Sequence, residues 1–340
     1  SLTQKILVIR FSSIGDIVLT TPVIRTLHKQ LGAEVHFLTK SAFAPILHAN
    51  PHVARVITLS DDFDEMLSTL KSQQYDHIID LHHNIRTKRI KIALARPSTA
   101  FKKLNFQKWL LVRFGITRLP DTHIVDRYLA AGVSLGIKRD GKGLDVFIPP
   151  EREIDIRTAF GADPGTYVAI VIGAAHQTKC LTADQITRLC NGIGRPVILL
   201  GGKDEMTKAQ AIIKATTSEK VCDASGRFDI LQSASIIRQA GVVITHDTGL
   251  MHIAAALQKP QVVIWGNTIP EFGMYPYYGD DKTRWISIEQ KGLQCRPCSK
   301  LGFPECPKGH FKCILAHDID GIAAAAEEIF SGVNGSSHTE

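Results

Sequence analysis

The feature that most constrains the fold is a regular alternation between short apolar, β-branched segments and longer amphipathic segments of helical periodicity. The expected strands are residues 5–9, 34–39, 53–59 and 76–81 in the first half and 167–172, 196–200, 242–245 and 261–265 in the second. Strands that alternate with helices over short loops form parallel sheets with helices on both faces. The sequence therefore predicts an α/β protein built on doubly wound parallel sheets.

The length and one break in the alternation predict two domains. A chain of 340 residues exceeds what one core usually organises. Pro149 and Pro150 cannot continue a helix or a central strand, and a polar segment follows, so we place the boundary there. The expected domains are 1–150 and 151–330, both Rossmann-like and facing a central cleft, with a disordered tail at 331–340.

A strand-to-helix turn in the second half is a candidate anion site. Residues 242–252 read V-V-I-T-H-D-T-G-L-M-H, and the turn is expected at residues 246–249. The first N–H groups of a helix and the positive end of its dipole favour a bound phosphate. Thr248 offers a hydroxyl group, Gly249 permits close approach, and His252 points back toward the same place. The alternative is that Asp247 or Thr248 only caps the helix.

Two further loops at strand ends carry polar groups that suit the same task. Residues 12–16 follow the first strand, and residues 173–179 follow the first strand of the second half. If Asp16 faces Lys179 and the helix start near Thr248, these groups are suited to transferring a group from a phosphate ester to a hydroxyl. Asp16 would accept the hydroxyl proton, and the cationic side would stabilise the departing phosphate. The alternatives are a helix cap for Asp16, a surface role for Lys179 and a core role for His252.

Positive charge is concentrated in one segment. The net charge is +7, yet residues 81–120 contain no Asp or Glu. The same segment holds ten basic residues: Arg86, Lys88, Arg89, Lys91, Arg96, Lys102, Lys103, Lys108, Arg113 and Arg118. Such a block suggests an anionic partner, which can be nucleic acid, a phosphorylated acceptor or a membrane leaflet rich in acidic lipid. A solvated helix face is the alternative interpretation.

The sequence shows no apolar run of membrane-spanning length and no secretory signal, so we expect a cytoplasmic protein. In that compartment the seven cysteines are expected to be thiols or metal ligands. Four of them form the pattern C-x₂-C-x₇-C-x₆-C and could bind structural Zn²⁺, with His310 as a rival ligand: Cys295, Cys298, Cys306 and Cys313. Unmetallated thiols and disulfides remain open. Cys180, Cys190 and Cys222 are expected to be core residues.

Two motifs together carry a resemblance to a known family. The first is K-I-L-V-I-R-F-S-S-I-G-D at residues 5–16, followed by Thr20, Thr21 and Pro22, and the second is H-D-T-G-L-M-H-I-A-A-A at residues 246–256. In order and spacing the chain resembles the heptosyltransferases of lipopolysaccharide core synthesis, glycosyltransferase family 9. The resemblance implies a GT-B fold, an ADP-heptose donor and inversion at the anomeric carbon. It also implies an anionic lipid A-Kdo acceptor at the cytoplasmic face of the inner membrane of a Gram-negative bacterium, with peripheral contact to that leaflet.

The resemblance also assigns roles. Asp16 matches the catalytic base and Lys179 the lysine that contacts the donor phosphates. The donor-binding cluster corresponds to Asp247, Thr248, Gly249 and His252. The chain departs from the family pattern at Leu181, where a tryptophan is usual, and at Ala174 and Ala175, where hydroxyl residues are common.

The acceptor and metal predictions follow from the same loops. Lipid A carries phosphates and Kdo carries carboxylates, so a basic first domain would attract both. We expect acceptor contacts from Ser12, Ser13 and Arg86. None of the three loops holds paired carboxylates for Mg²⁺ or Mn²⁺, so we predict a metal-independent enzyme without a required cofactor, in which Arg10, Lys179 and the helix end supply positive charge.

Rival functions fit the sequence less well. A nicotinamide-dependent oxidoreductase would need a G-x-G-x-x-G after a strand, and a P-loop kinase would need an upstream glycine and a hydroxyl residue where Asp204 follows Lys203. A nucleic-acid-binding protein leaves the motif loops unexplained, and we expect no nucleic-acid partner. A transferase using another nucleotide sugar and a nucleotide-sugar epimerase of the same fold remain open.

Overall fold

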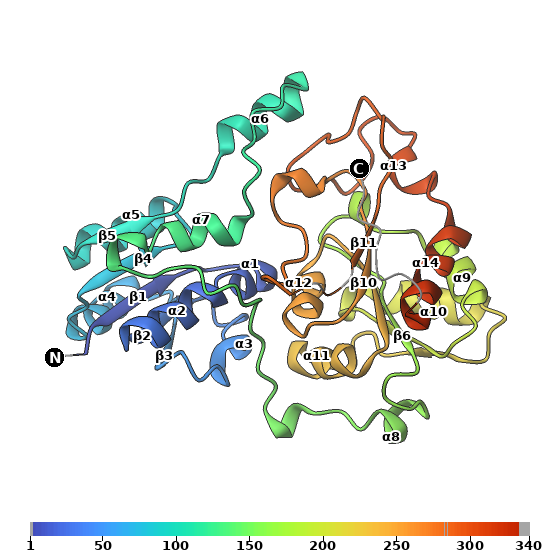
Figure 1. Cartoon of the computed structure of the whole chain (residues 1–340), viewed down its shortest axis with the longest axis horizontal. Helices are drawn as coiled ribbons and strands as arrows, with labels where there is room; N and C mark the ends of the chain where they lie inside the picture. Colours follow the sequence, from blue (N-terminus) through green and yellow to red (C-terminus); the bar gives the residue numbers. More distant parts are fainter. Residues whose placement is uncertain (1–2, 282, 284, 333–340) are drawn as a thin grey trace. The chain divides into compact units, whose positions relative to one another are not determined.

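The computed structural model describes residues 3–281, 283 and 285–332, which form two compact units. Among the described residues, the first unit comprises 3–105, 120–149 and 277–281, and the second comprises 106–119, 150–276, 283 and 285–332. Each unit contains a parallel sheet with its own apolar core (Figure 1). The prediction of an α/β protein with parallel sheets is confirmed.

The first unit is built on a five-stranded sheet in the order β3-β2-β1-β4-β5, and every pairing is parallel. The strands are β1 (Lys5–Ile9), β2 (Glu34–Thr39), β3 (Arg55–Thr58), β4 (His77–Asp80) and β5 (Ser98–Ala100). In the central strand, Ile6 lies opposite Val35 on one side and His77 on the other. Residues 6–9 of this strand are fully buried, as expected of a strand covered on both faces.

The helices of the first unit follow the predicted alternation. They are α1 (Ile14–Leu19), α2 (Thr21–Leu31), α3 (Pro45–His48), α4 (Phe63–Ser72), α5 (Ile85–Leu94) and α7 (Ile124–Ala130). Helix α1 has Ser13 at its N-cap and includes Asp16 in its first turn, and a second helix starts after Thr20. Pro22 lies near the start of α2, where its missing N–H leaves no hydrogen bond unmade.

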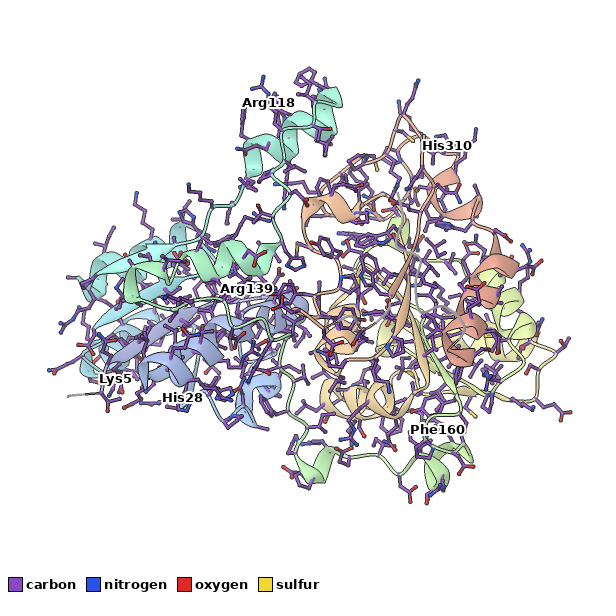
Figure 2. The ribbon with its side chains drawn as sticks, in the orientation of Figure 1. Lys5, His28, Arg118, Arg139, Phe160 and His310 are labelled. Carbon is purple, nitrogen blue, oxygen red and sulfur yellow. The ribbon has the colours of Figure 1, made fainter. Side chains whose placement is uncertain are left out.

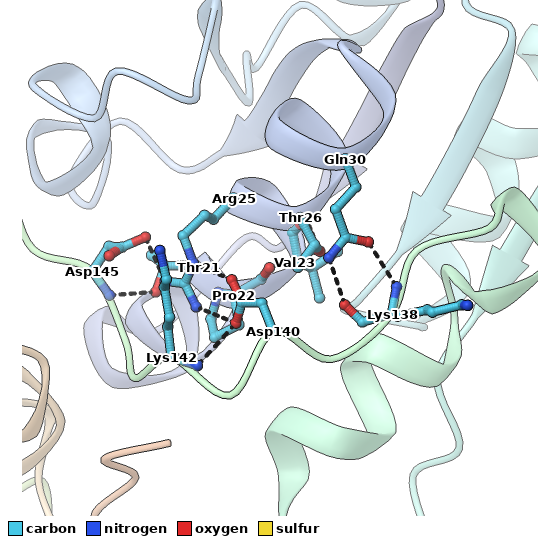
Figure 3. Close-up of polar contacts among 10 residues, drawn as sticks. All are labelled: Thr21, Pro22, Val23, Arg25, Thr26, Gln30, Lys138, Asp140, Lys142 and Asp145. Atoms are coloured by element: carbon cyan, nitrogen blue, oxygen red, sulfur yellow. Dashed lines mark hydrogen bonds and ion pairs between the residues drawn. The ribbon is translucent and has the colours of Figure 1, made fainter. Parts of the chain in front are cut away.

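A buried arginine fastens α2 to the chain that leaves the first unit. Arg25 is only 3% exposed, and its guanidinium lies 2.8 Å from the carboxylates of both Asp140 and Asp145 (Figure 3). Gln30 exchanges two 2.8 Å hydrogen bonds with the backbone of Lys138. These contacts order a segment that has no regular secondary structure, because each buried charge needs its partner.

The second unit contains a six-stranded parallel sheet in the order β11-β10-β9-β6-β7-β8. The strands are β6 (Val168–Val171), β7 (Val197–Leu200), β8 (Val221–Asp223), β9 (Val242–His246), β10 (Gln261–Ile264) and β11 (Trp285–Ile288). β5, β8 and β11 were not predicted. They have three or four residues and lack fully buried apolar runs, so they give no detectable periodicity.

The helices of the second unit are α6 (Asn105–Phe114), α8 (Ile156–Phe160), α9 (Ala183–Gly192), α10 (Met206–Ala215), α11 (Ile230–Gln239), α12 (Gly249–Ala256), α13 (Lys312–Leu315) and α14 (Ile319–Ser331). The basic helix α6 was not predicted. Ser331, placed in the predicted tail, is the last residue of α14, and the rest of that tail from 333 onward lies outside the described residues. Within the described chain, no helix has the length and apolar character needed to cross a bilayer.

Candidate active site

Both sheets reverse their strand order at one point, and the candidate residues cluster there. In the first unit the reversal lies between β1 and β4, and in the second it lies between β6 and β9. Ligands of doubly wound folds bind beyond the carboxyl ends of the strands at such points. The loops after these four strands carry Asp16, Arg86, Lys179 and Asp247. The structure therefore presents two half-sites, one in each unit.

The first half-site is centred on an ion pair between Asp16 and Arg10. The Asp16 carboxylate lies 3.0 Å from the Arg10 guanidinium, and their side chains are 20% and 14% exposed. The Ser13 hydroxyl donates to the same carboxylate at 2.9 Å, and the Ser13 backbone N–H lies 3.2 Å from it. These contacts belong to a capping box at the start of α1. Asp16 therefore has the predicted capping contact, and it also keeps a partly exposed carboxylate.

Arg10 is held rigidly by groups from three segments. Its guanidinium donates to the carbonyl oxygen of Ser12 at 2.6 Å and to that of Leu81 at 2.9 Å. It also donates to the hydroxyl of Tyr128 at 3.3 Å, whose pKa burial raises above its usual range. A guanidinium fixed in this way presents a permanent positive charge beside Asp16.

The loop after β4 adds a neutral histidine to this half-site. Burial, together with the charges of Arg10 and Lys103, lowers the pKa of His82 to about 4. The loop is shaped by Asp80, whose carboxylate accepts from the backbone N–H groups of His82 and His83 at 3.1 and 2.7 Å. Lys91 lies 2.8 Å from Asp80. Sequence reasoning missed Asp80, although an acidic residue at the end of a strand was the available signal.

The predicted acceptor residues have unequal roles in this geometry. Ser13 uses its hydroxyl on Asp16, and Ser12 supplies its carbonyl oxygen to Arg10. Arg86 is exposed, and its guanidinium lies 5.9 Å from the centre of the Phe11 ring. The structure thus brings Ser12, Ser13 and Asp16 together. It leaves Arg86 at the surface of the neighbouring loop, where a charged group is accessible to an anion.

The second half-site is centred on an ion pair between Lys179 and Asp247. The ammonium group of Lys179 lies 3.0 Å from the Asp247 carboxylate, and the side chains are 12% and 17% exposed. The Thr268 hydroxyl donates to the same carboxylate oxygen at 2.9 Å. Lys179 is therefore not a freely solvated surface lysine. Thr268 was not predicted, although it follows a strand end, β10, as the other candidates follow theirs.

Thr248 stands at the start of α12 with an unused hydroxyl. It occupies the N-cap position in extended backbone, but its side chain makes no capping hydrogen bond. Among the described residues its Oγ1 is buried without a hydrogen-bond partner. The side chain of Thr248 therefore does not cap α12, although the residue occupies the N-cap position. Gly249 is the first residue of α12, and His252, which is 3% exposed, lies in its first turn.

Neighbouring loops fix the position of Lys179. The carbonyl oxygen of Thr178 accepts from the N–H of Asn267 at 3.1 Å. A Cβ atom on Gly266 would lie 2.1 Å from that same oxygen, so this close approach requires glycine. On the other side, the N–H of Leu181 donates to Nε2 of His246 at 3.1 Å. Burial, with the charges of Lys208 and His317, lowers the pKa of His246 to about 3, which keeps Nε2 available as an acceptor.

The cysteine-rich segment packs against this loop. The hydroxyl of Thr178 donates to the carbonyl oxygen of Phe303 at 2.9 Å and accepts from its N–H at 2.8 Å. Arg296 donates to the carbonyl oxygens of Gly266 and Thr268 at 2.8 and 2.9 Å. The segment therefore contacts the residue before Lys179 and the neighbouring loop, a structural role that its cysteine spacing did not reveal.

The cysteines themselves are free thiols, which removes the disulfide alternative for this structure. A pocket of about 20 Å³ is lined by all four members of the motif and by His310: Cys295, Cys298, Cys306 and Cys313. The described residues nevertheless contain no group of three or more His, Cys, Asp or Glu side chains placed to hold a metal ion. The suggested zinc site is not supported, because the thiols line the pocket without forming a ligand shell.

Paired carboxylates occur elsewhere in the chain, at the N-terminal ends of helices. Two D-x-D sequences occur, at residues 62–64 and 318–320. Asp62 is the N-cap of α4 and accepts from the N–H of Glu65 at 3.0 Å, and Asp318 is the N-cap of α14. Neither pair lies in the loops of the two half-sites.

Comparison with known proteins gives one family. The family model described as "Glycosyltransferase family 9 (heptosyltransferase)" matches residues 65–301. A curated relative, lipopolysaccharide heptosyltransferase 3 of Escherichia coli K12, is 25% identical over 279 residues, covering 75% of this chain and 80% of the relative.

Solved structures agree in fold. The family 9 glycosyltransferase of Veillonella parvula superposes with a TM-score of 0.78 at 20% identity, covering 98% of this chain and 99% of the other. E. coli ADP-heptose lipopolysaccharide heptosyltransferase II superposes with a TM-score of 0.75 at 18% identity, covering 97% and 99%. The predicted GT-B fold is confirmed by these neighbours and by the two parallel-sheet units.

Proposed function

The chain belongs to glycosyltransferase family 9, the heptosyltransferases, and from that premise we propose that it transfers a heptose from ADP-heptose to a hydroxyl of the lipopolysaccharide inner core. The donor is suggested by the similarity in fold to the E. coli ADP-heptose lipopolysaccharide heptosyltransferase II. The acceptor class is suggested by the curated heptosyltransferase 3. The proposed division of labour assigns the acceptor to domain 1–150 and the donor to domain 151–330.

The observation that carries the donor assignment is the Lys179–Asp247 pair beside the unused Thr248 hydroxyl. An ammonium group, a buried hydroxyl and the N-terminus of an eight-residue helix lie within one loop system. A diphosphate supplies oxygen atoms for all three. As the glycosidic bond to the phosphate breaks, negative charge grows on the departing nucleotide, and these groups stabilise it. In this proposal Asp247, Thr248, Gly249 and His252 bind the donor.

The first half-site supplies the base. Asp16 accepts the proton of the attacking acceptor hydroxyl while Arg10, fixed 3.0 Å away, holds the carboxylate in position. Ser12, Ser13 and the exposed Arg86 contact an anionic acceptor. Attack on the face of the sugar opposite the nucleotide gives inversion. We further propose that the reaction needs no metal ion, because fixed cations replace it, and that the enzyme works peripherally at the cytoplasmic face of the inner membrane.

A ligand panel tests this function. Thermal unfolding is followed with ADP-heptose and with UDP- and GDP-sugars, each with and without EDTA. We expect stabilisation by the adenine nucleotide sugar that survives chelation. Stabilisation only by NAD, only by another nucleotide sugar or only in the presence of metal contradicts the proposal. Conversion of the donor into another nucleotide sugar in the absence of any acceptor would favour the epimerase alternative.

A further inference from the structure

The helix α6 has an unusual surface for a helix of a folded protein. None of its ten residues is buried, and Phe106, Trp109 and Phe114 are 63%, 51% and 59% exposed. Ile116, just beyond its end, is 44% exposed. Buried faces normally supply most of a helix's stability in a folded protein. Lys108 lies over the ring of Phe272, 5.6 Å from its centre, but the large apolar side chains of this helix remain exposed to water among the described residues. Such an exposed apolar surface marks a site of interaction.

The aromatic side chains form one cluster. The rings of Phe106 and Trp109 stack with centroids 5.9 Å apart, and those of Trp109 and Phe114 meet edge to face at 5.3 Å. The intervening Leu110, Leu111 and Val112 are only partly buried. The helix therefore exposes both aromatic and aliphatic surface as one continuous patch.

Charge surrounds this patch. The five basic residues in and around the helix are Lys102, Lys103, Lys108, Arg113 and Arg118, and no acidic residue occurs between residues 81 and 120. Figure 2 marks Arg118 beyond the end of the helix. Lysine and arginine attract acidic lipid headgroups at about 1 kcal/mol each, and Trp and Phe favour the boundary between headgroups and acyl chains.

We propose that residues 102–118 are a membrane-docking element that lies in the interface of an anionic lipid leaflet, with the Phe106–Trp109–Phe114 cluster inserted among the acyl chains. Single-stranded nucleic acid matches the charge and the rings, but bases do not use the aliphatic surface of Leu110, Leu111 and Val112. Acyl chains use both kinds of surface. The inference rests on the membrane location in the proposed function and names the element that makes the contact, but it is independent of the proposed reaction, because it concerns a different surface and a different ligand.

Vesicle flotation tests the proposal on the full chain. We expect binding to phosphatidylcholine vesicles containing one third phosphatidylglycerol, with little binding to pure phosphatidylcholine. Phe106→Ser and Trp109→Ser should each weaken binding about tenfold, since each ring loses its transfer free energy. The matched control is Leu301→Ser, which removes an equally exposed apolar side chain (66%) elsewhere and should bind like the unmodified chain.

Tryptophan fluorescence locates the inserted residue. Anionic vesicles should shift the emission of Trp109 to shorter wavelength, and brominated lipids should quench it. Trp109→Phe should abolish that change yet retain flotation, because the apolar ring remains. Trp265, at 1% exposure, should not respond.

Three outcomes overturn the proposal: no preference for anionic vesicles, unchanged flotation of the Phe106→Ser and Trp109→Ser variants, or tighter binding to single-stranded RNA than to vesicles. Transfer to a soluble, deacylated acceptor separates this proposal from the enzymatic one. That activity should persist in both serine variants, and its absence in the unmodified chain would count against the enzymatic proposal alone.

Discussion

The two half-sites are built on the same kind of ion pair but differ in the groups that surround it. In each, a carboxylate lies 3.0 Å from a cation at the point where the strand order reverses: Asp16 with Arg10, and Asp247 with Lys179. Arg10 is six residues from its partner and donates to two backbone carbonyl oxygens as well. Lys179 comes from a loop 68 residues away from Asp247. Among the described residues, a buried hydroxyl without a hydrogen-bond partner, that of Thr248, lies next to the second pair.

The difference indicates different tasks. In the first half-site the three contacts to the Asp16 carboxylate, from Arg10 and from the hydroxyl and N–H of Ser13, all use Oδ2, so Oδ1 is the atom placed to accept a proton. In the second half-site Lys179 and Thr268 contact the Asp247 carboxylate, and the hydroxyl of Thr248 lies at the N-terminus of α12. The proposed function accordingly assigns the base to the first half-site and the anion site to the second.

The largest expected effect is on turnover, and it tests whether Asp16 of the first pair acts as the base rather than as part of an anion site. Asp16→Asn should lower kcat about 10²- to 10⁴-fold, the usual contribution of a general base, while the thermal shift by the nucleotide sugar stays unchanged. Steady-state kinetics and thermal unfolding measure the two quantities. Asp62→Asn is the matched control, because an amide oxygen can still cap α4 there. Undiminished turnover of Asp16→Asn would remove the base assignment.

A substitution in the second pair should change both the turnover and the thermal shift by the nucleotide sugar. Lys179→Met should lower kcat by about 10²- to 10³-fold and abolish the thermal shift, because the charge that stabilises the leaving phosphate is gone. The exposed Lys220→Met serves as a control. Lys179→Met leaves the Asp247 carboxylate without its cation and should lower the unfolding temperature. Adding Asp247→Asn removes that unpaired charge and should restore the unfolding temperature but not the turnover. Recovery of turnover in that double variant would mean that the ion pair is only structural.

A smaller effect, on nucleotide-sugar affinity, tests whether the Thr248 hydroxyl contacts the ligand or caps α12. Thr248→Val should leave the unfolding temperature of the free protein unchanged, since the hydroxyl has no protein partner, and should weaken the nucleotide-sugar Kd about 3- to 10-fold. Thr268→Val instead removes a hydrogen bond to Asp247 and should cost about 1 kcal/mol of stability. Calorimetry and urea unfolding read out each variant. Loss of stability in Thr248→Val would restore the capping interpretation.

The smallest effect concerns pH. His246 has a folded pKa of about 3, below its unfolded value near 6.5, so the folded chain binds fewer protons between these values. Its contribution to stability is complete above pH 6.5 and is lost as pH falls toward 3. The free energies of unfolding from urea titrations at pH 7 and pH 5 should therefore differ by about 1 to 2 kcal/mol less in His246→Gln than in the parent chain, whereas the exposed His48→Gln should behave like the parent chain. Equal pH dependence in His246→Gln would contradict this.

The sequence predicted long, buried elements better than short, half-buried ones. β1 and β9 were recognised because residues 6–9 and 242–245 are runs of apolar or β-branched residues that the sheet buries, whereas β5 and β11 are short and only partly buried. Helix α6 was missed because Leu111 and Val112 place apolar residues on other sides of the helix than the Phe106–Trp109–Phe114 cluster. The candidate residues could be named from their positions at strand ends, but their partners could not. Thr268 and Tyr128 come from other segments of the chain.

By itself, the order of residues determined the parallel α/β architecture and the loops that carry polar groups, because strand and helix periodicity are local properties. Only the tertiary structure decided that Lys179 pairs with Asp247, that Thr248 keeps an unused hydroxyl, and that the cysteine-rich segment packs against the loop of Lys179 through Phe303 and Arg296. Those outcomes depend on which side chains reach one another across the sheet, and hydrogen-bond and ion-pair distances are set by packing rather than by spacing along the chain.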